Sequence, residues 1–170
     1  MLSKNIFTVF LLLLLTNVAS AQVNGTLTPS SIVGTATNDN APALSIGEYV
    51  SSNVGNTSIS TVTQTDLTSI SLTAGDWDVE GTITYVADAT TIPVYLVASI
   101  NTVSATNAAS GRLGRTDKGE TSGTGSTISL PTGRKRISLA ATTTVYLVAY
   151  AQFSVSTMIA IGEIAARRVR

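Results

Sequence analysis

The sequence contains no cysteine and no histidine among its 170 residues. The missing cysteines exclude disulfides, thiolate metal sites and thiol nucleophiles. The missing histidines exclude a Ser-His-Asp triad, imidazole acid–base catalysis and histidine metal ligands. Charged residues are also few, at 12% of the chain, and there is a single tryptophan. Stability therefore depends on packing, or on association between copies, rather than on covalent or metal cross-links.

The N-terminus has the features of a secretory signal peptide. Lys4 precedes an apolar run of ten residues, 6–15, which is too short to span a bilayer comfortably. The sequence Ala19-Ser20-Ala21 fits the small-x-small rule of signal peptidase, so we expect residues 1–21 to be removed by cleavage after Ala21. An uncleaved N-terminal anchor is the alternative. The sequence thus predicts a secreted, extracellular protein.

The remainder divides into an arm and one domain. Residues 22–45 are rich in Ser, Thr, Asn, Gly and Pro, which predicts an extended N-terminal arm or linker. Residues 46–170 contain short stretches of alternating apolar and polar residues, separated by turn signals such as Gly55-Asn56. This pattern predicts a single all-β domain, a jelly-roll-like antiparallel β-sandwich of about eight strands.

The stretch 75–88 is the longest predicted strand. Its odd-numbered positions include Trp77, Val79, Ile83, Tyr85 and Ala87, and its even-numbered positions carry mainly acids and threonines. Such alternation is typical of a strand with one buried and one wet face. We therefore expect Trp77 to anchor the core.

Three acids lie on the wet face of this strand, namely Asp76, Asp78 and Glu80. The simplest interpretation is a solvated acidic surface. Two alternatives are an oxygen-ligand calcium site and a pair of carboxylates, Asp78 and Glu80, in a secreted glycan hydrolase. We expect neither a cofactor nor catalysis, so the chain is interpreted as a non-enzyme.

Two further predicted strands, 93–101 and 142–153, are apolar on both faces. A strand covered on both sides has this composition, either inside a sandwich or at a subunit contact. Tyr95, Tyr146, Tyr150 and Phe153 belong to these strands. Aromatic residues with a polar tip suit subunit contacts, although ordinary core or surface positions are an equal alternative.

Charge is divided along the chain. Residues 22–110 carry seven acids and no base, whereas residues 111–170 carry nine bases and three acids. This division favours pairing between strands or between subunits, and the alternative is a basic tip that faces an acidic partner. Basic clusters occur at 134–136 and 167–170. Because the charges of residues 22–170 nearly cancel, pairing with the acidic strand or binding of anionic cell-surface glycans is a better interpretation than a nucleic-acid partner.

Several segments in this order resemble a known family. They are IGEYVSSNV (46–54), TSISLTAGDWDVEG (68–81), YLVASINT (95–102), RISLAATTTVYLVAYAQFSVST (136–157) and IAARRVR (164–170). Together they resemble the C-terminal β domain of tail-fibre and other virion structural proteins of bacteriophages and prophages. The resemblance implies a homotrimeric jelly roll, similar to the complement and tumour-necrosis-factor type, with no catalytic constellation. The signal-like N-terminus departs from most virion proteins.

The segment 102–125 is polar, with five glycines, and includes Arg112, Arg115 and Lys118. Long connections of this kind are functional or mobile, and we expect these three residues to contact a receptor. The sequence therefore favours a structural or receptor-recognition module on a tail fibre or virion surface. Its expected partners are its own copies, a cell-surface glycan or protein receptor, and other virion proteins through the N-terminal arm. A secreted bacterial adhesin or carbohydrate-binding module is the alternative function.

Overall fold

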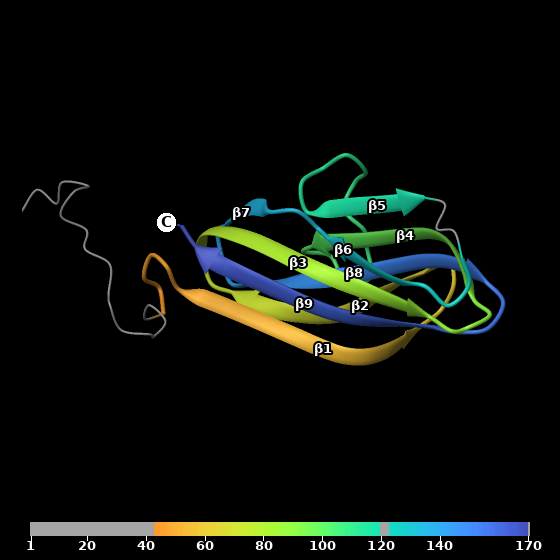
Figure 1. Ribbon diagram of the computed structural model, residues 1–170. Coiled ribbons are helices and arrows are strands. Elements are labelled where there is room, and N and C mark those ends of the chain that lie inside the picture. Colours follow the sequence, from red (N-terminus) through yellow and green to blue (C-terminus); the bar gives the residue numbers. More distant parts are fainter. Residues whose placement is uncertain (1–42, 120–122, 170) are drawn as a thin grey trace, which may run out of the picture. The chain divides into compact units, whose positions relative to one another are not determined.

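The alternating stretches of the sequence form strands throughout the domain (Figure 1). The computed structural model describes residues 43–119 and 123–169; the predicted signal peptide and nearly all of the predicted arm lie outside these residues. Within this part of the chain the elements are nine strands: β1 (Tyr49–Ile59), β2 (Thr63–Leu72), β3 (Gly75–Ala87), β4 (Ile92–Asn101), β5 (Arg115–Gly119), β6 (Thr127–Pro131), β7 (Lys135–Leu139), β8 (Thr143–Ser154) and β9 (Met158–Arg168). The described residues contain no helical segment that could span a membrane.

The strands form two antiparallel sheets. Sheet A has the order β1-β9-β3-β6, and β7 also pairs with β3; sheet B has the order β2-β8-β4-β5. β6 lies opposite Thr82–Val86 and β7 opposite Gly75–Val79, so the two short strands follow one another along β3. When they are counted as one interrupted strand, this order matches that of a jelly roll. The prediction of an all-β antiparallel sandwich is confirmed.

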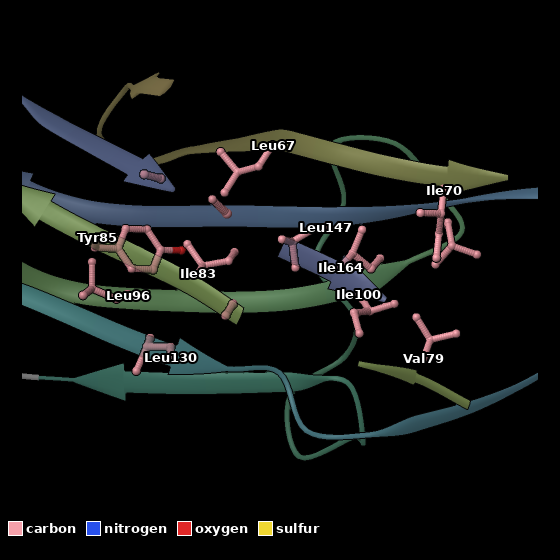
Figure 2. Packing of buried hydrophobic residues seen from close by; sticks show 14 of the residues in the cluster. Leu67, Ile70, Val79, Ile83, Tyr85, Leu96, Ile100, Leu130, Leu147 and Ile164 are labelled. Carbon is pink, nitrogen blue, oxygen red and sulfur yellow. The ribbon is translucent and has the colours of Figure 1, made fainter. Parts of the chain in front are cut away.

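The core lies between the two sheets (Figure 2). The predicted inner face of β3 is buried, and Trp77, Val79 and Ile83 have no exposed surface. Tyr85 is also buried, and its hydroxyl donates a hydrogen bond of 2.6 Å to the carbonyl of Val97 on the opposite sheet. The polar tip of this tyrosine thus has a partner inside the sandwich, as burial of a hydroxyl requires.

Gly81 interrupts the apolar row of β3 for a steric reason. A Cβ at Gly81 would lie 2.9 Å from Leu147 Cδ1, and a Cβ at Gly162 would lie 2.9 Å from Leu147 Cδ2. The two glycines lie close together on neighbouring strands of sheet A: Gly81 of β3 pairs with Ile164, and Gly162 of β9 pairs with Ile83. Their missing side chains therefore make the space that the leucine of the opposite sheet fills.

Two β-bulges change the expected pattern. The predicted turn at Gly55-Asn56 is wrong: β1 continues through both residues, which lie between the pairs Val54–Gly162 and Thr57–Ala160. The chain turns instead after Ile59. An extra residue in one strand is a bulge, and glycine tolerates it well.

The second bulge lies in β2, between Asp66 and Thr68. Strict alternation predicts that Leu67 faces away from Ile70 and Leu72, but all three side chains are buried in the core. The extra residue shifts the alternation by one position, so that Leu67 lies on the same buried face as Ile70 and Leu72.

An arginine joins the two ends of the described chain to the core. Arg168 of β9 is buried, its Nε donates to Glu48 Oε2 at 2.9 Å, and its guanidinium carbon lies 4.3 Å from the centroid of the Trp77 ring. The same guanidinium donates to the carbonyl of Ala74 at 2.7 Å and to the hydroxyl of Thr73. One side chain thus links the segment before β1, the β2–β3 turn and the last strand.

Candidate functional site

The loop between β4 and β5, residues 102–114, lies across the outer face of sheet B. Its Ser104 hydroxyl and Ala105 amide donate to the two carboxylate oxygens of Asp66 on β2, at 2.5 and 2.7 Å. Gln64 of the same strand accepts from another loop amide at 2.6 Å. The loop therefore begins on β4 and reaches the opposite edge of the sheet.

Returning toward β5, the loop is held again at β4. The Ala108 amide donates to the hydroxyl of Ser99 at 2.7 Å. Arg115, the first residue of β5, donates to the carbonyl of Ala108 and, through Nε, to Asp117 Oδ1 at 2.7 Å. Side-chain bonds to three strands thus fix the position of a segment that has no regular structure of its own.

This loop explains part of the two-sided burial that the sequence shows. Asp66, Val148 and Ser99 are successive neighbours across β2, β8 and β4. Since the loop bonds both Asp66 and Ser99, it crosses over Val148, which has no exposed surface and lies outside the core between the sheets. A segment of the same chain, rather than another subunit, covers this part of sheet B.

The ion pair below the loop shifts the pKa values of both members. The hydrogen bond to Asp117 raises the pKa of Arg115 and outweighs burial, which alone would lower that pKa. Burial alone would raise the pKa of Asp117, but the hydrogen bonds from Arg115 and Tyr95 outweigh it and lower that pKa. Burial, together with the carboxylate of Asp117, raises the pKa of Tyr95. Both members of the pair are therefore held in their charged forms at neutral pH.

A basic groove lies between this loop and β7. The groove has a volume of about 600 Å³, and three of its lining residues carry positive charge: Arg112, Lys135 and Arg136. Gly114 ends the loop with φ +80°, and a Cβ there would lie 2.8 Å from Lys135 Cδ. The glycine thus allows the aliphatic part of Lys135 to lie directly against the loop.

The three residues that the sequence offers as receptor contacts do not form one site. Arg112 lines the basic groove and is exposed. Arg115 is half-buried and holds the loop in place. Lys118 is exposed on β5, and because it lies three residues from Arg115 it faces the other side of that strand.

The acids on the outer face of β3 are paired with arginines, and the prediction of a solvated surface is wrong for Asp76, which is buried. Arg136 Nη2 lies 3.2 Å from Asp76 Oδ2, and Arg134 lies 4.0 Å from Asp78 and 3.6 Å from Glu80. With Arg168 and Glu48, these pairs join the acidic first part of the chain to its basic second part, as the division of charge predicts. In the described residues, no cluster of three or more carboxylates is placed to hold a metal ion.

The four predicted subunit-contact residues occupy two different faces of sheet B. Tyr95, Tyr146 and Tyr150 are half-buried on the outer face, where the rings of Tyr95 and Tyr150 meet edge to face with centroids 6.2 Å apart. Phe153 instead packs against the core. Contact of any of these residues with another copy stays a prediction.

Sequence reasoning missed the contribution of β7 to the groove. The run Arg134-Lys135-Arg136 is visible as a basic cluster, but nothing in the sequence indicates that Lys135 and Arg136 meet Arg112 across the loop. In comparisons with known proteins, no family model and no curated protein matches the chain.

Proposed function

We propose that this chain is a non-enzymatic structural or receptor-recognition module of a tail fibre or similar virion appendage, which works as a homotrimer at the virion surface. The observation that carries this proposal is the basic groove beside a loop that is already fixed. Side chains of β2, β4 and β5 hold residues 102–114 in place, so a ligand would lose little loop entropy on binding.

Association between copies would raise the strength of such a surface. The groove is open and shallow, and individual contacts to exposed charges are weak. Three grooves on one particle would convert weak single contacts into useful avidity. The half-buried tyrosines on sheet B offer amphipathic surface for contact between copies.

A secreted adhesin or carbohydrate-binding module is the second candidate. The signal-like residues 1–21 favour it, because export through a signal peptide belongs to a secreted bacterial protein rather than to most virion proteins. Both candidate functions use the same groove, and they differ in whether the protein belongs to a virion or is secreted by a bacterium.

The test of the proposal is the solution mass of the purified protein by light scattering, followed by sedimentation with whole bacterial cells. We expect the mass of three chains and co-sedimentation with cells. A mass of one chain combined with the absence of cell binding would refute the trimeric recognition module. A trimer that stays in the supernatant with every cell type would restrict the proposal to a structural role.

A further inference from the structure

The basic groove carries an excess of positive charge. Arg136 is paired with Asp76, but Arg112 and Lys135 have no ion-pair partner in residues 43–119 and 123–169. Two of the three positive residues that line the groove, Arg112 and Lys135, therefore carry charge that is unpaired among the described residues, on a chain whose formal net charge is zero. A groove of this kind attracts an anion.

The rest of the lining is small and partly apolar. Ala108, Ala109 and Gly111 contribute no bulky side chains, and Leu113 at the margin is 72% exposed. Small apolar side chains beside cationic groups suit the C–H face of a pyranose ring whose substituent is negatively charged.

We propose that this groove binds an anionic carbohydrate, with Arg112 and Lys135 holding the carboxylate or sulfate of the sugar and Leu113 and Ala109 contacting its ring. The inference rests on the proposed function and names the class of its receptor. A guanidinium and an ammonium at one site recognise an oxyanion by charge-assisted hydrogen bonds.

Other polyanions fit the groove less well. An acidic peptide would add as a strand to a sheet edge, but the groove offers no length of edge: its strand residues in the described chain are only the last residue of β4, Asn101, and the first two of β7, Lys135 and Arg136. Single-stranded nucleic acid requires aromatic platforms for its bases, and none of the described residues that line the groove is aromatic. The open shape favours a ligand that lies along the surface.

The test is a calorimetric titration of the full-length protein with four probes: tetragalacturonate, its methyl ester, a heparin-derived tetrasaccharide and tetraglutamate. We expect tetragalacturonate to bind and the uncharged ester to bind at least tenfold more weakly. If the heparin fragment binds as well, the groove accepts both carboxylated and sulfated sugars; if it does not, the groove selects uronic-type carboxylates. Each of these results supports the inference.

Variants connect the binding to the groove. We expect the double variant Arg112→Gln, Lys135→Gln to bind tetragalacturonate about tenfold more weakly, whereas Lys118→Gln, which removes an exposed charge outside the groove, should stay within twofold of the parent. All three side chains are at least partly exposed, so folding should be unaffected.

Four results would overturn the inference: no binding of either anionic sugar, equal binding of the ester, equal loss in Lys118→Gln, or tighter binding of tetraglutamate. The last would assign the groove to an acidic protein. If the sugars fail while the protein is trimeric and binds cells, the inference is wrong and the proposed function stands. A monomer that binds these sugars but no cells would leave the inference correct and the virion function wrong.

Discussion

Replacement of Arg168 by methionine should destabilise the fold more than any other change of a single charged residue in this domain. Methionine keeps the unbranched apolar stem but removes the guanidinium. The guanidinium bonds Glu48, Ala74 and Thr73 and stacks on Trp77, with only 5% of the side chain exposed. The substitution therefore removes contacts to three separate segments at once.

The size of the loss in unfolding free energy depends mainly on Glu48, whose carboxylate stays without its arginine partner. Loss of one member of a buried ion pair costs about 3–5 kcal/mol, because the other member stays in a medium of low polarity. Glu48 is 14% exposed and still accepts the Leu44 amide at 2.8 Å, so part of its charge can be rehydrated. The lost stacking on Trp77 adds roughly 0.5–2 kcal/mol. We expect the free energy of unfolding to fall by about 3 kcal/mol at pH 7.

The pH dependence supplies an independent check. Burial raises the pKa of Glu48, but the hydrogen bonds from Arg168 and from the Leu44 amide outweigh it and lower that pKa. A lowered pKa stabilises the folded state above the unfolded carboxyl value of about 4.3, and this contribution is lost as the pH falls through the folded value. The difference between the parent and Arg168→Met should therefore be largest near neutrality and shrink below about pH 4.

The assay is urea unfolding, followed by tryptophan fluorescence, at pH 7 and at several acid values. Arg167→Met is the matched control, because Arg167 is the preceding residue of β9 and is exposed. It should change the free energy of unfolding by less than about 0.5 kcal/mol. Equal losses in the two variants, or a difference that does not change with pH, would refute the assignment of stability to the Arg168 contacts.

Three further changes test the packing and the loop. Gly162→Ala should lower the free energy of unfolding by about 1–3 kcal/mol, because its Cβ would press on the leucine of the opposite sheet; Gly55→Ala, with no atom within 4 Å, is its control and should be near neutral in the same urea assay. Tyr85→Phe should cost about 1–2 kcal/mol in thermal unfolding, since it leaves a buried carbonyl without its donor. Arg115→Gln should accelerate hydrogen exchange of residues 102–114 without changing exchange in the core strands, and unchanged exchange would show that the arginine does not hold the loop.

The core residues could be predicted from the sequence because the side chains of a strand alternate between its two faces with a period of two residues. On β3, alternation over 75–88 is enough to assign Trp77, Ile83 and Tyr85 to the interior, and all three are buried. The bulges could not be predicted, because an inserted residue looks like any other residue until the partner strand is known. Leu67 shows this plainly: strict alternation places it on the wrong face, and pairing with β8 corrects the assignment.

The sequence predicts that the acidic and basic parts of the chain pair with each other, but it does not predict which residues form the ion pairs. Residues 22–110 carry seven acids and residues 111–170 carry nine bases, which indicates only that the two parts of the chain lie close together in the fold. Which charges pair depends on strand order: β7 lies beside β3, so Arg134 and Arg136 reach the acids of that strand. Arg167, in contrast, is exposed while its neighbour Arg168 is buried, a difference that follows from the alternation of β9.

The candidate site could not be predicted as a whole, because two connections of the jelly roll create it together. The loop 102–114 follows β4, and Lys135 begins β7, with β5 and β6 between them in the sequence. Reading 102–125 as one polar segment treats Arg112, Arg115 and Lys118 as equivalent cations. The fold gives them different roles: Arg112 lines the groove, Arg115 holds the loop by hydrogen bonds, and Lys118 lies on the surface of β5. The recognition chemistry of this site therefore depends on which unpaired charges the fold brings to the groove, and in the described part of the chain these are Arg112 of the loop and Lys135 of β7.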